Sequence, residues 1–222
     1  MEKWVKGFFF CLLAFGLVFA GRLETWADQK PALAMLPFFL EKGEDPARGA
    51  ICPVCKSVYQ RGNIVPGSQN TLTRLLYQKM EALGTFRIIP LEVVEKTLPP
   101  SVKSQFEQKP IATALRIGKE LNADFISVEY LFRFEERVGS SLGVEKPASV
   151  AFDLHLFRVK DGMEVWKGKF DETQKPLSDD LLKIGSFLRR KAAWVTAEEL
   201  ASDGMGEMLK KLPDPKELEE RR

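Results

Sequence analysis

The sequence is poor in the residues from which most active sites are built. It has one histidine, His155, and three cysteines among 222 residues. It contains no G-x-S-x-G nucleophile motif, no P-loop and no glycine-rich dinucleotide fingerprint after its first strand-like run. A catalytic triad would have to use His155, and no nucleophile motif accompanies it. We therefore expect no catalytic residues and a protein that is not an enzyme.

The sequence also lacks an excess of charge of one sign. Its 33 lysines and arginines against 31 acidic residues give a net charge of +2, and no basic stretch is segregated. Nucleic-acid binding requires a basic face that neutralises phosphates, so this class of partner is excluded. Adjacent acidic pairs such as Glu135-Glu136 point apart on a helix and are typical of a solvated surface.

The first residues have the three-part pattern of an export signal. Lys3 and Lys6 precede an apolar run at 8–20, and a polar stretch then ends at Ala27. The run is shorter than the roughly 20 apolar residues of a transmembrane helix. A retained signal anchor or a buried helix is the alternative interpretation.

We therefore predict a signal peptide over residues 1–27, cleaved after Ala20 or Ala27. The mature chain is expected in the periplasm or at the periplasmic face of the outer membrane. Cys11 lies inside the apolar run without the setting of a lipoprotein signal, so no lipid anchor is predicted, and membrane contact by other means stays open.

Apolar periodicity predicts that strands and helices alternate along the mature chain. The predicted strands are apolar or alternating runs, at 32–40, 86–90, 123–132, 150–159 and 165–170. The predicted helices repeat apolar residues at helical spacing, at 69–83, 110–121 and 177–212. The order βαβαβββα predicts an α/β fold of the mixed α+β kind, with a mixed sheet of about five strands covered by helices.

This pattern divides the chain into three parts. The signal peptide is followed by an α/β domain at 28–175, which carries an insertion loop at 41–67 rich in glycine and proline. A helical extension at 176–222 completes the chain. Within it we expect a break at 202–204, where Gly204 follows Ser202 and Asp203, and a frayed end at 214–222.

The insertion loop holds the one chemically reactive motif of the mature chain, Cys52-Pro53-Val54-Cys55. In an oxidising compartment a local disulfide between Cys52 and Cys55 is the leading interpretation. A metal site is the second, and redox chemistry is the third, because turn-forming residues separate Cys55 from the next helix. We therefore expect no cofactor, with zinc as the alternative.

A zinc site needs four ligands, and the sequence supplies only two cysteines close together. His155 is one hundred residues away in an alternating strand, where a role as a strand-face residue is favoured over one as a ligand. Two chains could complete a four-cysteine site across a dimer, because Cys-Pro-Val-Cys-Lys resembles half of a zinc knuckle.

Aromatic residues are the remaining candidates for function. Tyr59 and Trp194 are either core residues or anchors for a protein partner, since aromatic side chains dominate many interfaces. Trp194 follows a basic stretch in an amphipathic tail, which favours a helix packed on the sheet over a partner-binding or membrane-surface helix.

Several phrases of the chain resemble an envelope-protein family. They are Leu36-Pro37-Phe38 after the first strand, ATALRIGKELNADFISVEYLF at 112–132 and ASVAFDLHLFRVKDGMEVWKGKF at 148–170. Over residues 31–172 the chain looks like the α/β domains of the curli-secretion protein CsgG, the penicillin-binding-protein activator LpoB and the amino-terminal domain of TolB.

This resemblance implies a periplasmic, non-enzymatic domain that acts through protein contacts, in envelope assembly or secretion. Its partner would be another envelope protein or a second copy of the chain. The chain departs from the family in two respects: it lacks the lipobox of many members, and the CxxC loop is an addition.

Overall fold

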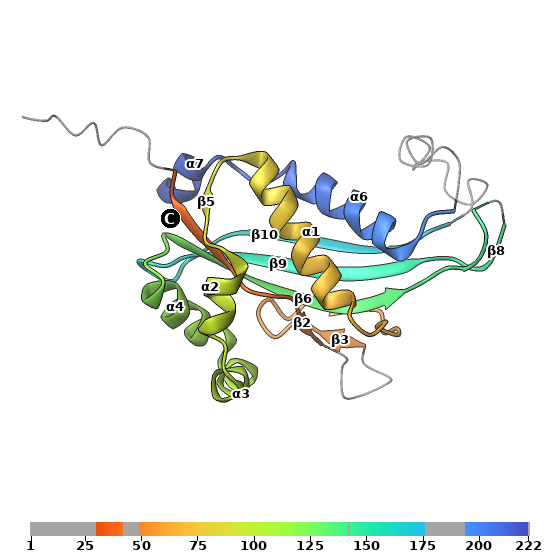
Figure 1. Cartoon of the computed structure of the whole chain (residues 1–222), viewed down its shortest axis with the longest axis horizontal. Helices are drawn as coiled ribbons and strands as arrows, with labels where there is room; N and C mark the ends of the chain where they lie inside the picture. The colour runs from red at the N-terminus through yellow and green to blue at the C-terminus, as the bar shows by residue number, and fades with distance from the viewer. Residues whose placement is uncertain (1–29, 42–48, 142, 176–193, 222) are drawn as a thin grey trace, which may run out of the picture.

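A mixed six-stranded sheet forms the centre of the protein (Figure 1). The computed structural model describes residues 30–41, 49–141, 143–175 and 194–221. Five strands lie in the order β10-β9-β6-β1-β5, and β2 pairs with β6 off this path. Their bounds are Ala32–Met35 for β1, Phe39–Leu40 for β2, Arg87–Ile88 for β5, Phe125–Glu135 for β6, Ser149–Arg158 for β9 and Glu164–Thr173 for β10.

Parallel and antiparallel pairing divide the sheet. β1 runs parallel to both β5 and β6, as expected when helical crossovers connect the strands. β6, β9 and β10 are antiparallel neighbours, and Asp161-Gly162 lies in the connection between β9 and β10. The predicted mixed α/β fold is confirmed, with the short β2 as a further strand.

The neighbouring strands β6 and β9 are covered on both faces. Every residue of β9, and every residue of β6 except Glu135, is buried. On one face α1 (Ser68–Leu83) and α6 (Ala197–Leu209) lie side by side (Figure 1). On the other face lie α2 (Leu91–Lys96), α3 (Pro100–Gln108) and α4 (Pro110–Glu120). This double cover explains why both strands carry apolar residues on both of their faces.

The insertion loop packs on the same face as α2 to α4. Its described part forms a hairpin of β3 (Ala50–Ile51) and β4 (Val58–Tyr59). Ala50, Cys52 and Tyr59 belong to the core on this face. Arg133 of β6 fastens the end of the loop, because its guanidinium donates to the Gln60 carbonyl at 2.7 Å and to Asp171 at 2.6 Å.

The C-terminal segment differs from its prediction in two places. α6 continues without a break through Ser202-Asp203-Gly204. Gly204 is not a helix breaker here but a point of close approach, since a Cβ atom on it would lie 2.3 Å from the Phe170 ring of β10. The predicted frayed end is also wrong: α7 (Pro215–Glu220) buries Leu218 fully, and Arg158 donates to the carbonyls of α7.

This close approach makes a prediction about stability. We expect Gly204→Ala to lower the free energy of unfolding by about 1–3 kcal/mol, since overpacking against Phe170 outweighs the gain in helix propensity. Thermal unfolding would show a fall in Tm of about 3–10 °C. Gly206→Ala is the matched control. A Cβ atom on Gly206 would lie 3.6 Å from its nearest neighbour, the Lys79 ammonium, so we expect the free energy of unfolding to rise by about 0.5–1 kcal/mol. Equal Tm values for the two variants would contradict the packing argument.

Several predictions concern segments outside the described residues. They are the signal peptide at 1–27, residues 42–48 of the insertion loop and residues 177–193 of the helical extension. Within the described ranges, no helix has both the length and the apolar character needed to cross a lipid bilayer. The division into domains stays a prediction, although α6 and α7 share one hydrophobic core with the sheet.

Candidate metal centre

Strand β9 places two polar side chains on one face of the sheet. Asp153 and His155 are two residues apart, so they point the same way from the strand. Both are 1% exposed and lie beneath the insertion loop. They stand beside Val128 and Tyr130 of β6, which belong to the core on this face. A carboxylate and an imidazole in such a place need partners, because buried polar groups without hydrogen bonds are costly.

The CxxC turn supplies those partners. It connects β3 to β4, and it is closed by hydrogen bonds from the Cys52 amide to the Ser57 carbonyl at 2.9 Å and from the Lys56 amide to the Cys52 carbonyl at 3.0 Å. Lys56 takes a left-handed conformation, with φ of 60°. The tight turn also brings the Cys55 amide to within 3.4 Å of the Cys52 Sγ. Both thiols consequently face β9.

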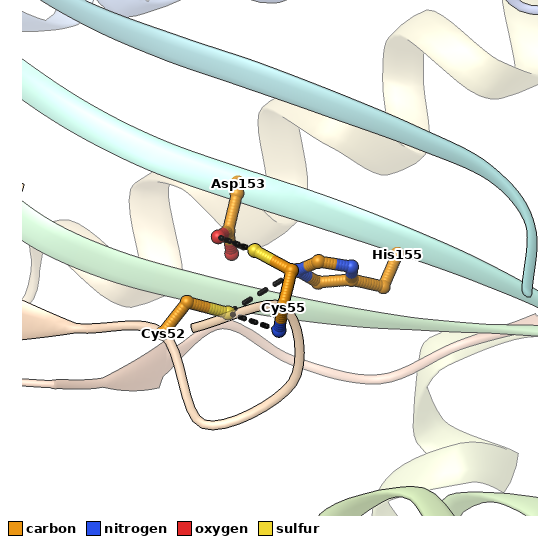
Figure 2. Close-up of side chains that lie close together, drawn as sticks. All are labelled: Cys52, Cys55, Asp153 and His155. Carbon is orange, nitrogen blue, oxygen red and sulfur yellow. Dashed lines mark hydrogen bonds and ion pairs between the residues drawn. The ribbon is translucent and has the colours of Figure 1, made fainter. Parts of the chain in front are cut away.

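Figure 2 shows how the four side chains converge. Cys52 Sγ lies 3.3 Å from His155 Nε2, and Cys55 Sγ lies 3.8 Å from Asp153 Oδ2. The Asp153 Oδ2 and His155 Nε2 atoms are 3.3 Å apart. All four donor atoms lie within 4.8 Å of one another. We call Cys52, Cys55, Asp153 and His155 the four-donor cluster.

The surroundings of the cluster change the pKa values of its members. Burial lowers the pKa of His155, but hydrogen bonds with Asp153, Cys52 and Glu164 outweigh burial and raise it to about 11. Burial raises the pKa of the Cys52 thiol. Burial also opposes ionisation of Cys55, yet hydrogen bonds with Ser57 leave the pKa of this thiol below its ordinary value. The pocket thus favours a positive charge beside its acidic groups.

A second layer of side chains orients the cluster. Glu164 of β10 contacts His155 Nδ1 at 2.5 Å, which directs Nε2 towards Cys52. The Tyr59 hydroxyl donates to Asp153 Oδ2 at 2.9 Å. The Tyr59 ring stacks on Phe132, with centroids 3.9 Å apart. The contact between Glu164 and His155 is the arrangement in which a carboxylate fixes the tautomer of a metal-bound histidine.

One oxygen of the cluster has no partner. Asp153 Oδ1 is buried without a hydrogen bond, while Oδ2 accepts from Tyr59. Buried carboxylate oxygens are normally satisfied, and a bound ion is one of the recognised reasons for an exception. Because Cys52, Asp153 and His155 are each at most 1% exposed, the cluster is nearly closed to solvent, and Cys55 is its half-buried member.

The structure shows where His155 and Tyr59 lie, two residues for which the sequence left alternative roles open. His155 does lie on a strand face, but it is in contact with the CxxC motif rather than remote from it. Tyr59 is 1% exposed and supports Asp153, so it cannot serve as a surface anchor for a partner. Trp194 is half-buried, with its backbone joined to Ser141 and Arg137, and its role in an interface stays a prediction.

Both cysteines of the motif are free thiols in the structure. Cys52 faces His155, and Cys55 faces Ser57 and Asp153. The disulfide between Cys52 and Cys55 therefore stays a prediction, to be decided by the mass measurement described below.

Sequence reasoning missed Asp153 and Glu164. The available signal was the Asp-x-His spacing in AFDLHLF, where two polar residues share one face of a strand that is otherwise apolar. Glu164 could have been found from the hairpin, because the Asp161-Gly162 turn brings the start of β10 beside the end of β9.

A comparison with protein-family models finds no match, and a comparison with curated protein sequences finds none either. Among solved structures, the PelC dodecamer from Paraburkholderia phytofirmans is similar with a TM-score of 0.45 and 13% identity, over 86% of this chain and 89% of that chain. Lipoprotein GNA1162 from Neisseria meningitidis is similar with a TM-score of 0.40 and 14% identity, over 73% of this chain and 98% of that chain.

The LpoB C-terminal domain from Escherichia coli gives a TM-score of 0.37 and 13% identity, over 65% of this chain and 84% of that chain. LpoB is a member of the group that the sequence resembles. The resemblance to CsgG and TolB stays a prediction.

Proposed function

We propose that this chain binds one zinc ion in the four-donor cluster and that the ion has a structural role. The observation that carries the proposal is the spacing of the donors. A tetrahedral zinc ion with Zn–S of about 2.3 Å and Zn–N or Zn–O of about 2.1 Å sets donor atoms about 3.3–3.8 Å apart. Three of the six separations between the cluster's donor atoms are 3.3 Å, 3.3 Å and 3.8 Å, and all six lie within 4.8 Å.

The donor types favour zinc over other common ions. Two soft thiolates and an imidazole, with one carboxylate, suit the borderline-soft zinc ion and not magnesium or calcium, which prefer oxygen ligands throughout. Four protein ligands fill a tetrahedral site, whereas catalytic zinc sites keep one position for water. The burial of Cys52, Asp153 and His155 agrees with a closed site. These features support a structural rather than a catalytic role for the ion.

Such an ion would fix the insertion loop to the sheet. Cys52 and Cys55 belong to the β3–β4 hairpin, and Asp153 and His155 belong to β9. The ion would therefore join segments about one hundred residues apart in sequence. A disulfide between Cys52 and Cys55 would close only a small ring within the loop, which gives limited entropic stabilisation.

Mass spectrometry under native and denaturing conditions tests the proposal. We expect the purified mature protein to carry one zinc ion per chain under native conditions and to lose it on denaturation, with both thiols then reactive towards an alkylating reagent. A protein that is two hydrogens lighter after denaturation, with no metal in the native spectrum, contains the disulfide, and the zinc proposal is then wrong.

Glu164 gives a further prediction about this site. We expect Glu164→Gln to weaken zinc binding about 10- to 100-fold, because the carboxylate that orients His155 is replaced by a neutral amide. Competition with a chromophoric chelator measures the change in Kd. Glu145→Gln makes the same chemical change at an exposed residue of β8 (Val144–Lys146) and should leave Kd unaltered. If the two variants bind zinc equally, Glu164 has no orienting role.

We further propose that the protein is exported and acts in the cell envelope through contacts with another envelope protein or with itself. The N-terminal pattern at 1–27 and the resemblance to LpoB-like domains support this role. Cell fractionation of the full-length chain and of a form lacking residues 1–27 tests export. Chemical cross-linking in intact cells tests the contacts, and an exclusively monomeric protein would count against them.

A further inference from the structure

A groove opens at the carboxyl end of the central parallel strand β1, beside the metal centre. Its volume is about 660 Å³, within the range of small-ligand and side-chain pockets. The residues after β1 form one wall, and α2 and α3 form the other. β1 lies between its parallel neighbours β5 and β6; α1 connects β1 to β5 on one face, and α2 to α4 connect β5 to β6 on the other. Open α/β sheets bind their ligands outside the carboxyl ends of their strands.

The floor and walls of the groove are largely aromatic and aliphatic. Phe39 stacks on Phe106 with ring centroids 4.0 Å apart and an interplanar angle of 13°, and it contacts Tyr130 at 5.9 Å. Leu40, next along the chain, is 40% exposed. Phe39 itself is only half-buried. An exposed leucine beside an aromatic stack provides apolar contact area that the described residues leave uncovered.

The charged groups of the groove all have one sign. Glu41, Glu95 and Glu107 line it, and among its described lining residues there is no lysine or arginine. Glu95 and Glu107 are exposed, on α2 and α3. Gln69 and Asn70, in the first turn of α1, contribute only neutral amides and the partial positive charge of the helix end. An apolar groove with carboxylates around it is complementary to a cation.

We propose that this groove binds a basic segment of a partner protein, with an arginine or lysine next to an apolar residue. A guanidinium or ammonium group would pair with Glu95 and Glu107 and lie over the Phe39 ring, where a cation–π contact adds attraction. The neighbouring apolar side chain would cover Leu40. This inference names the partner chemistry for the protein contacts proposed above, and it rests on that part of the proposal.

The metal centre contributes one edge of this surface. Pro53 lines the groove and stands between the two cysteines of the four-donor cluster. The Phe38 amide donates to Thr73 of α1 at 3.0 Å, which fixes the opposite edge. The groove is therefore held by rigid elements on both sides, which lowers the entropic cost of binding a peptide.

Fluorescence polarisation with two labelled hexapeptides tests the inference on zinc-loaded protein. The probe is Gly-Phe-Arg-Leu-Lys-Gly, and its charge-reversed counterpart is Gly-Phe-Glu-Leu-Glu-Gly. We expect saturable binding of the basic peptide at low salt and at least about ten-fold weaker binding of the acidic one. The double variant Glu95→Gln, Glu107→Gln should raise Kd about five-fold, as expected for two exposed charge pairs. Glu92→Gln, on the same helix but outside the groove, should change nothing.

Three outcomes would overturn the inference. The first is equal binding of the two peptides, and the second is an unchanged Kd in the double variant. The third is displacement of the peptide by putrescine at equal concentration, which would mark a site for small amines. Zinc content is measured on the same samples, so a failure of peptide binding is separate from a failure of the metal centre. If wild type and the double variant cross-link to the same partner equally well, the groove is not the binding site, while the proposed role in protein contacts still holds.

Discussion

Substitution of His155 by alanine should weaken zinc binding by about 100- to 1,000-fold. Structural zinc sites bind with about 10–16 kcal/mol, so each of four donors accounts for about 3–4 kcal/mol. His155 is the nitrogen donor nearest to Cys52, at 3.3 Å. Titration against a competing chelator gives the two Kd values. The thermal stabilisation by zinc should fall in step, because a ligand that binds only the folded state stabilises it by RT ln(1 + [L]/Kd).

The control for this experiment is Lys160→Ala. Lys160 is exposed in the connection between β9 and β10 and offers no donor to the cluster. We expect one zinc ion per chain and an unchanged Kd in this variant. If His155→Ala retains wild-type affinity, the ion is held by other residues, and the cluster in Figure 2 is not the zinc site.

The same titration separates two kinds of zinc site. The sequence left open a site in which two chains each donate Cys52 and Cys55 to a shared ion. The structure supplies all four donors from one chain, through Asp153 and His155. A site within one chain predicts one zinc ion per monomer and a Kd that does not depend on protein concentration. A site shared across a dimer predicts one ion per two chains.

The sheet could be predicted from sequence because its signals are local. The apolar run of β6 and the alternation in β9 and β10 are visible within ten residues, and the Asp161-Gly162 turn specifies their antiparallel pairing. The parallel pairing of β1 with β5 and β6 follows from the helices between them. Such features depend on the backbone and on periodicity rather than on particular long-range contacts.

The four-donor cluster could not be predicted because it depends on a contact between distant segments. Cys52 and His155 are 103 residues apart, and only the folded path of the insertion loop brings them together. The sequence identifies the two cysteines, but it shows only which possible ligands are near them along the chain and not which are near them in space. Gly204 in α6 shows the same difficulty. A glycine is needed there because the Phe170 ring lies too close for a Cβ atom, and not because the backbone needs conformational freedom.

Glu129 is the second residue for which we expect a large effect. Its side chain is fully buried on the α1 face of β6, where the Ser127 hydroxyl donates to Oε1 and Oε2 has no hydrogen-bond partner. Burial raises the pKa of Glu129 to about 8, although the hydrogen bond from Ser127 opposes the rise. The folded protein therefore holds a neutral carboxylic acid near pH 7.

The direction of the pH dependence follows from this raised pKa. Below pH 4.5, the ordinary pKa of a glutamate, both the folded and the unfolded chain hold the proton, and the group has no effect. Between about pH 4.5 and 8 the unfolded chain loses the proton while the folded chain keeps it, so stability falls as pH rises. One pKa unit corresponds to 1.36 kcal/mol, which gives a cost of about 4–5 kcal/mol at pH 8.

We therefore expect Glu129→Gln to raise Tm at pH 8 by about 8–20 °C and to leave it nearly unchanged at pH 4.5. Glutamine has the same shape and can still accept from Ser127, but it cannot ionise. Thermal unfolding should be followed in zinc-free protein, because a bound dication would itself favour the carboxylate.

Glu135→Gln, on the same strand, provides a control of opposite sign. Burial acts against ionisation of Glu135 too, but the Asn63 amide and Lys146 outweigh it and lower the pKa of this carboxyl. The stability that Glu135 contributes is therefore present above pH 4.5 and lost as pH falls, so its replacement should lower Tm at pH 8. A Glu129→Gln variant that is no more stable than wild type at pH 8 would show that this carboxyl is ionised and solvated in the folded protein.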